Sequence, residues 1–218
     1  MNLAWIVDNL PRIAELTLAH AVLALVPLVV SVVVSVPVGW WAHKKRWLKQ
    51  VVLSGSGVLY ALPSLAVFII APIILGTMIL DPINVMVALS LYGIALLVRT
   101  AVDAFESVGR NTRDDAVAIG HSKSQIFWRV ALPLAGPPLL AGARVVSAST
   151  LSLVSVGALI GVPSLGYFFT DGYQRAFLTE IWVGIIGTVL LAVVFDAVLV
   201  ILGRLLLPWV RVLDRTKA

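Results

Sequence analysis

Two aspartates and a histidine stand close together in the sequence, at Asp114, Asp115 and His121, and are the nearest approach to a hydrolytic cluster. Carboxylates beside an imidazole could serve acid–base catalysis in an enzyme embedded in a membrane. No serine, histidine and aspartate recur together within one predicted layer of the protein, which leaves a nucleophilic triad without support. We therefore expect no catalytic residue and no enzymatic activity in this chain.

Composition and motifs also argue against a bound cofactor. The sequence has no cysteine, which excludes disulfides, thiolate zinc sites, iron–sulfur clusters and a cysteine nucleophile. The three histidines, at His20, His43 and His121, are too scattered to form a metal site. The phosphate-binding pattern G-x-x-x-x-G-K-[ST] is missing, so any energy from ATP has to come from another subunit.

The elements that position these side chains are predicted to be membrane spans. Of the 218 residues, 60% are apolar and 12% are charged, far fewer than the roughly 25% charged residues of soluble domains. A hydrocarbon core needs about 20 apolar residues of helix. Five stretches between charges are long enough, and they predict spans at about 16–42, 51–79, 83–103, 137–160 and 181–205. We therefore expect an all-α, polytopic membrane protein whose single domain covers residues 1–218.

The distribution of Lys and Arg predicts the orientation of these spans. Most of the sixteen cationic residues follow the first span, lie between the third and fourth spans, where Arg99 is counted, or follow the fifth. The opposite side holds only Arg12 and Arg175. Because cytoplasmic borders are enriched in Lys and Arg, the N-terminus is expected outside and the C-terminus in the cytoplasm. Cations spread along span borders, rather than in one patch, also argue against nucleic acid as a partner.

Two charged residues lie inside the predicted spans. A charge within the bilayer costs at least ~2.5 kcal/mol and therefore needs a partner. Arg144 and Asp196 lie at similar depths, roughly 10–12 Å from the cytoplasmic boundary at 1.5 Å of helix per residue. The sequence predicts a salt bridge between them, within the chain or with a second copy. The alternative is that Arg144 reaches the headgroups while Asp196 bonds to a hydroxyl or is protonated.

The cytoplasmic segment at about 104–135 is longer than a helical bundle needs for a turn. Thr112 followed by Asp115 has the pattern of a capping box, which predicts the start of a short helix there. Gly120 then predicts a left-handed helix end. The segment therefore begins with a short helix and a sharp corner.

A second short helix is predicted after the corner, from a capping box at Ser122 and Gln125 to an end at Leu132 and Pro133. Helices of this length are marginal on their own in water. The pair is therefore expected to dock on another surface, either a partner protein or the membrane boundary.

The spacing of this segment resembles a known family signature. The stretch D-D-A-V-A-I-G from Asp114 to Gly120 is followed, after nine residues, by V-A-L-P ending at Pro133. It resembles the E-A-A, three residues, G, nine residues, I-x-L-P signature of ABC-importer permeases, with Asp114, Asp115 and Val130 replacing glutamate, alanine and isoleucine. The resemblance implies a coupling helix that docks in a cleft of an ATPase subunit, formed here by Asp114, Asp115, Ala116, Gly120, His121, Leu132 and Pro133.

Three further stretches resemble permeases that import glycine betaine, carnitine, choline and proline betaine: Tyr60–Leu65, Gly142–Arg144 and Gly161–Gly166. The resemblance implies a type I ABC importer permease fold in a prokaryotic plasma or inner membrane. It also implies a second permease copy or paralogue, an extracytoplasmic solute-binding protein, and ATPase subunits that hold ATP and Mg. Transport would follow alternating access.

A quaternary ammonium solute has no proton to donate, so its recognition would rest on aromatic faces. Tyr60 and Tyr92 are the intramembrane candidates, with Pro63 and Ser64 as neighbouring pathway or gate residues. Ordinary packing is the alternative role for both tyrosines. The rival functions are an importer of methionine or another amino acid, a membrane-embedded enzyme, and a scaffold without transport activity.

Overall fold

A computed structural model describes residues 2–209 of the chain, and its secondary structure in that range is entirely helical. The helices are α1 (Leu3–Asp8), α2 (Leu10–Ala42), α3 (Arg46–Ala61), α4 (Ser64–Leu75), α5 (Pro82–Ser107), α6 (Arg110–Ala118), α7 (Lys123–Gln125), a π segment (Ile126–Ala131), α8 (Leu132–Gly157), a 3-10 turn (Ala158–Ile160), α9 (Tyr167–Gln174) and α10 (Leu178–Leu206). The predicted all-α membrane architecture is confirmed. Four helical segments are each long and apolar enough to span a membrane, and α3 with α4 forms a bent fifth.

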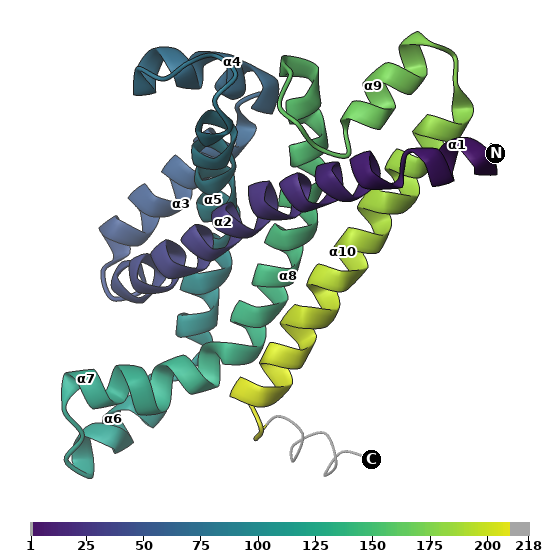
Figure 1. Cartoon of the computed structure of the whole chain (residues 1–218). Helices are drawn as coiled ribbons and strands as arrows, with labels where there is room; N and C mark the ends of the chain where they lie inside the picture. The colour runs from purple at the N-terminus through teal and green to yellow at the C-terminus, as the bar shows by residue number, and fades with distance from the viewer. Residues whose placement is uncertain (1, 210–218) are drawn as a thin grey trace.

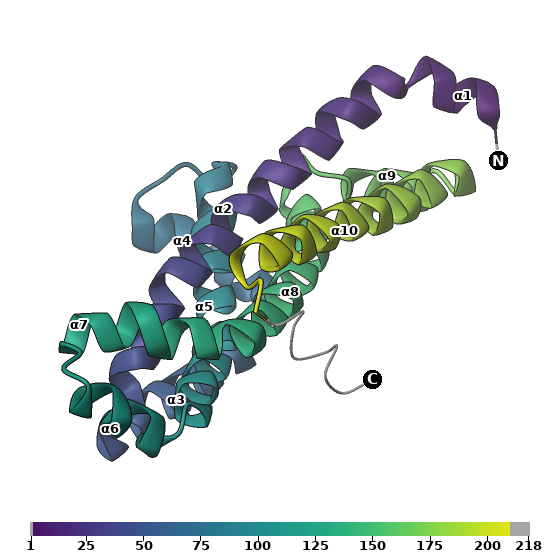
Figure 2. The same ribbon diagram turned by 90° about the horizontal axis from the view of Figure 1, so that it is seen from below.

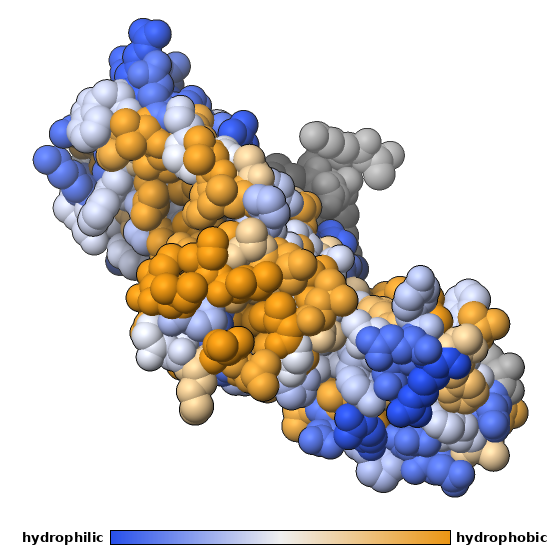
Figure 3. Space-filling view, turned by 90° about the horizontal axis from the view of Figure 1, so that it is seen from above, coloured by the Kyte–Doolittle hydropathy of each residue, from blue (hydrophilic) through white to orange (hydrophobic). Residues whose placement is uncertain are grey.

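The bundle has two ends (Figure 1). Helices α6 and α7 lie at one of them, called here the α6 end, and α4 and α9 lie at the other, the α9 end. Figure 2 shows α6 and α7 beside the last turns of α2 and the start of α3. Apolar side chains occupy the middle of the surface seen in Figure 3, with hydrophilic side chains toward both extremities. This distribution suits a molecule whose middle lies in hydrocarbon.

The segment 51–79, predicted as one continuous span, forms two helices instead. Helices α3 and α4 meet at a bend of 102°. Pro63 disfavours helical backbone in the residue before it, and Leu62 is accordingly extended, with φ −67° and ψ 139°. The hydroxyl of Tyr92 donates to the Leu62 carbonyl over 2.7 Å, so the break leaves this oxygen paired. The prolines inside α2 and α4, by contrast, do not end their helices.

The fourth span also differs from its predicted bounds of 137–160. Helix is continuous from Lys123 to Ile160, so Leu132 and Pro133 do not end it. In the π segment before them, the Leu132 N–H bonds the carbonyl of Phe127, five residues back. This wider turn precedes Pro133 in the first turn of α8, where a missing N–H is tolerated. The coupling corner and the fourth span are therefore one piece of helix.

Helix α5 is the centre of the bundle and packs against α2, α3, α4 and α8. Small residues bring these helices close together. A Cβ on Gly142 of α8 would lie 2.8 Å from the side chain of Thr100. A Cβ on Gly39 of α2 would lie 2.5 Å from Ala101 Cβ. Close backbone approach of this kind is how membrane helices gain packing energy without a hydrophobic driving force.

The loop Gly161–Gly166 at the α9 end folds into the core. Gly161 has a φ of 85° and turns the chain after the 3-10 segment. Ser164 is fully buried, and its hydroxyl donates to the Val154 carbonyl of α8 over 3.4 Å. The loop thereby fixes α9 against the end of α8.

Candidate functional site

The first helix of the coupling segment begins earlier than its sequence predicts. Helix α6 starts at Arg110 with Gly109 as its N-cap, so Thr112 is inside the helix and caps nothing. The reason is that α5 continues to Ser107, and the chain turns at Gly109 straight into α6. Thr112 and Asp115 are therefore both on the surface of a formed helix.

The corner after α6 is confirmed as predicted. Gly120 has a φ of 89°, in the left-handed region that only glycine adopts readily. The His121 N–H bonds the Ala116 carbonyl over 3.0 Å, and the Gly120 N–H bonds Val117 over 2.9 Å, which together form a Schellman motif. The capping box that follows is also present, with Ser122 and Gln125 bonding each other's backbone N–H.

Within residues 2–209, helix α6 is held against the bundle by a polar contact, a buried side chain and its packing on the π segment. Arg113 donates from Nη1 to Nε2 of His43, which follows α2, over 2.6 Å. A guanidinium has only donors, so His43 must accept with a neutral ring. Burial, reinforced by the charge of Arg113, lowers the pKa of His43 and favours that neutral form. Ala116 is buried beneath the helix.

The opposite side of α6 has no cover within residues 2–209. Val117 and Ile119 are 58% and 75% exposed, and Asp114 and Asp115 are exposed beside them. His121 is half-buried at the corner. Leu132 and Pro133, predicted to belong to the same docking unit, lie instead in the first turn of α8. An exposed surface that combines apolar and acidic residues suits a protein partner better than lipid.

A polar cavity of about 310 Å³ lies among α3, α5 and α8. Its wall is formed by Tyr60, Leu62, Ser64, Tyr92, Ser149, Ser152 and Leu153. The rings of Tyr60 and Tyr92 meet edge to face, with centroids 6.2 Å apart. Three of the four predicted pathway residues thus share one cavity, whereas Pro63 forms the adjoining helix break.

Ser149 and Ser152 were missed as cavity residues by sequence reasoning. They stand three apart on α8, the spacing that places two residues on one helix face. This spacing is the one sequence signal that marks the two serines as a pair. Nothing in the sequence, however, indicates that this face is opposite Tyr60.

A smaller cavity of about 160 Å³ has one lining residue, Tyr60, in common with the first. Its other lining residues are Ser56, Gly57, Ala95, Leu96 and Arg99. Sequence reasoning counted Arg99 among the cytoplasmic border cations. In the structure, α5 extends eight residues beyond it to Ser107, which places Arg99 within the helix.

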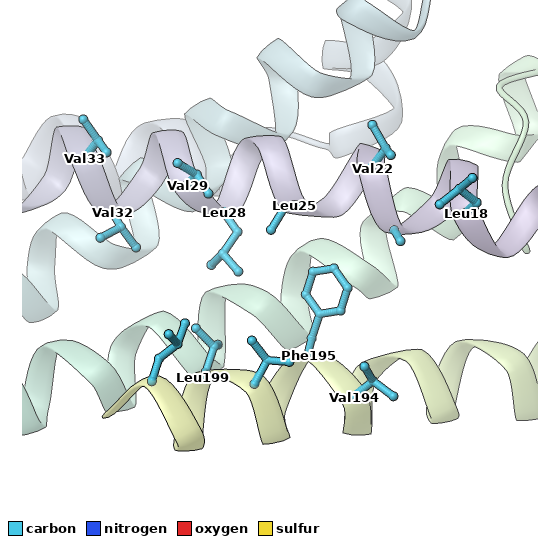
Figure 4. A pocket seen from close by; sticks show the side chains of 13 residues that line it. Leu18, Val22, Leu25, Leu28, Val29, Val32, Val33, Val194, Phe195 and Leu199 are labelled. Atoms are coloured by element: carbon cyan, nitrogen blue, oxygen red, sulfur yellow. The ribbon is translucent and has the colours of Figure 1, made fainter. Parts of the chain in front are cut away.

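The largest of these three cavities differs from the other two in its lining. A groove of about 520 Å³ runs between α2 and α10 (Figure 4), and its wall consists of Ala, Val, Leu and Phe side chains, among them Leu28 and Phe195. Such a wall offers no hydrogen bond or charge to a polar solute. The two cavities that meet at Tyr60 are therefore the candidate solute site, despite their smaller size.

Arg144 and Asp196 meet across α8 and α10. Nε and Nη2 of Arg144 donate to Oδ1 and Oδ2 of Asp196 over 2.5 and 2.8 Å. Two parallel bonds of this kind give the strongest geometry for such a pair. Both side chains are 45% exposed and lie away from the cavities lined by Tyr60. The pair links the last two spans of the chain.

Residues 32–212 match the model of the family described as binding-protein-dependent transport system inner membrane component. The chain belongs to this family. The permease is 28% identical to the osmoprotectant import permease protein OsmW of Salmonella typhimurium, over 94% of this chain and 96% of that protein. It is 26% identical to the glycine betaine/carnitine/choline transport system permease protein OpuCD of Bacillus subtilis, over 87% and 82% of the two chains.

The fold of the permease is also found in a solved importer. A crystal structure of an amino acid ABC transporter with histidines superposes with a TM-score of 0.75 at 14% identity, covering 94% of this chain and 98% of that one. This likeness shows the fold of a type I ABC importer permease. Within the described residues, no cluster of three or more potential metal ligands accompanies that fold.

Proposed function

We propose that this permease translocates an osmoprotectant with a quaternary ammonium group, such as glycine betaine, choline, carnitine or proline betaine. The observation that carries the proposal is the cavity in which Tyr60 and Tyr92 meet beside the hydroxyls of Ser149 and Ser152. Aromatic faces attract a cation that has no proton to donate, and the hydroxyls serve the polar remainder of the solute. The two relatives, an osmoprotectant import permease and a glycine betaine/carnitine/choline permease, support the same solute class.

The energy for transport comes, in this proposal, from ATPase subunits that hold ATP and Mg and dock at the α6 end. The exposed side of α6, which carries Asp114 and Asp115 beside Val117 and Ile119, is the docking surface. In this proposal, the α6 end is in the cytoplasm together with the C-terminus, which lies outside the described residues, and the N-terminus is on the outer side. A solute-binding protein delivers solute at the α9 end, and a second permease copy or paralogue closes the pathway.

Transport follows alternating access between two states. Closure of the ATPases around ATP draws two coupling corners together and opens the pathway outward. Solute then enters from the binding protein. ATP hydrolysis separates the corners again and returns the permease to the inward-open state.

Reconstitution tests this proposal. The permease, its ATPase and its binding protein are placed in vesicles, and uptake of radiolabelled glycine betaine, choline and methionine is measured with solute-stimulated ATP turnover. We expect ATP-dependent uptake of a quaternary ammonium solute. Ile119→Asp, which puts a charge into the docking surface, should reduce uptake at least about tenfold, because an unpaired charge buried in an interface costs several kcal/mol.

Ile119→Val is the matched control, since it keeps an apolar side chain at the same position, where Ile119 is 75% exposed, and should leave uptake unchanged. Uptake of methionine alone would assign the permease to amino-acid import. Absence of ATP-dependent uptake of every solute would leave the enzyme or scaffold alternatives and would contradict the proposal.

A further inference from the structure

Two arginines in the interior of spanning helices, Arg99 on α5 and Arg144 on α8, differ in their partners. Arg144 is neutralised by Asp196 through two hydrogen bonds. Arg99 makes no hydrogen bond, ion pair or ring contact with any residue between 2 and 209. Asp103, one helical turn further along α5, is exposed and forms no ion pair with it. An unpaired charge in a spanning helix marks a functional site more often than a structural one.

The position of Arg99 is fixed by the antiparallel contact of α3 and α5. At the α6 end, Lys49 pairs with Glu106 over 2.7 Å. Deeper in the bundle, a Cβ on Gly57 would lie 3.9 Å from Nη2 of Arg99, which puts the guanidinium alongside α3. Arg99 is seven residues, or roughly 10 Å of helix, from Glu106. It therefore lies well inside the span.

Arg99 and the tyrosine pair line two cavities that have Tyr60 in common. Arg99 lines the smaller cavity, Tyr92 lines the larger, and Tyr60 lines both. Along α5, Arg99 and Tyr92 are again seven residues apart, or roughly 10 Å. Tyr60, 46% exposed, stands between them. A short solute can therefore touch the ring of Tyr60 and the guanidinium at the same time.

We propose that Arg99 is a specificity-determining residue that binds the carboxylate of a zwitterionic solute while Tyr60 holds the quaternary ammonium group. A guanidinium matches a carboxylate with two parallel hydrogen bonds, and Tyr60 supplies the aromatic face that such a cation needs. The permease accordingly favours betaine-type zwitterions over choline, which has a hydroxyl in place of the carboxylate. This inference rests on the proposed function and narrows its solute class.

The test compares two solutes in vesicles that contain permease, ATPase and binding protein. Uptake of radiolabelled glycine betaine and of choline is measured above the concentrations that saturate the binding protein, so that only later steps discriminate. We expect Arg99→Gln to reduce glycine betaine uptake about tenfold, the equivalent of one charged hydrogen bond, and choline uptake less than about twofold. Arg99→Lys should keep part of the glycine betaine uptake. Arg46→Gln, an exposed cation at the start of α3, is the control and should change neither.

Each contrary outcome has a definite meaning. An equal loss for both solutes, no loss for either, or a wild type that imports choline alone would overturn the role of Arg99 and leave the proposed function intact. Restored glycine betaine uptake in Arg99→Asp combined with Asp103→Arg would overturn it too, because it would show an ion pair between permease copies. A wild type that imports neither solute would overturn the proposed function itself.

Discussion

Arg144 and Arg99 show two ways in which this protein accommodates a cation inside a spanning helix. Arg144 is matched within the chain, on helices α8 and α10, by a carboxylate at the same depth. Arg99 has no such match among residues 2–209 and lines a cavity whose walls are polar on one side. In the first arrangement the charge of Arg144 holds two helices together. The second leaves the charge available, which is useful only where a solute or water reaches it.

The largest effect is expected where the matched pair is broken. Asp196→Asn leaves Arg144 without a counter-charge, because the two hydrogen bonds from its Nε and Nη2 atoms both end on that carboxylate. We expect several-fold less folded permease in the membrane, measured by size-exclusion chromatography in mild detergent. Exchanging the charges, as Arg144→Asp with Asp196→Arg, should restore the yield. Yields that remain low in the exchanged protein would count against a role for the pair in assembly.

A smaller effect is expected at the helix break beside the cavities. Tyr92→Phe removes the hydroxyl that donates to the Leu62 carbonyl. The loss of one such bond lowers the free energy of unfolding by about 1 kcal/mol, which corresponds to roughly 2–4 °C in the melting temperature. Tyr173→Phe is the control, since Tyr173 is 81% exposed. Equal melting temperatures for the two variants would show that the bend does not depend on Tyr92.

Arg113 falls between Arg144 and Arg99 in how well its charge is matched. Its partner, His43, accepts the hydrogen bond only while the imidazole ring is neutral. The pKa of His43 is lowered by burial and by Arg113, with Lys44 adding to the effect. The contribution to stability is therefore present above about pH 6.5, the ordinary value, and is lost as pH falls through the lowered one. His43 is only half-buried, so we expect a decrease of no more than about 2 °C between pH 7.5 and 5.

His43→Gln provides the comparison, because its side-chain oxygen accepts from Arg113 at every pH. Its melting temperature should fall less than that of the wild type over the same range. Identical pH profiles would remove His43 as the source of the change.

The smallest effect on folding is expected at Arg99. Since it has no partner in the described chain, Arg99→Gln should change the melting temperature by less than about 1 °C, as surface substitutions do. The measurement uses the same detergent preparation as Asp196→Asn. A melting temperature several degrees below that of the wild type would show that Arg99 supports folding, as Arg144 does, and would contradict the contrast between them.

The sequence predicts those features whose cause is local. Gly120 and the Ser122–Gln125 box specify the corner through backbone bonds within a few residues, and the corner is there. The class of the fold also follows from local information, because apolar length alone separates spans from loops. The facing of Arg144 and Asp196 follows from helix geometry and charge counting.

Features that depend on a distant partner are missed. Pro63 is a usual site for a kink in a membrane helix, but the full break depends on Tyr92 of another helix pairing the free carbonyl. Leu132 and Pro133 have the pattern of a helix end, yet a π turn carries the chain through. The cavity formed by Tyr60 with Ser149 and Ser152 exists only after α3 and α8 have packed on α5.

The helix from Lys123 to Ile160 is continuous over 38 residues but is not straight, because its first part runs at an angle to α8 (Figure 1). The glycine corner precedes one end of it, and the folded-in loop follows the other. Ser149 and Ser152 stand on its far half. In the proposed cycle, a displacement of the corner therefore reaches these two hydroxyls through hydrogen-bonded helix alone, because no loop lies between them.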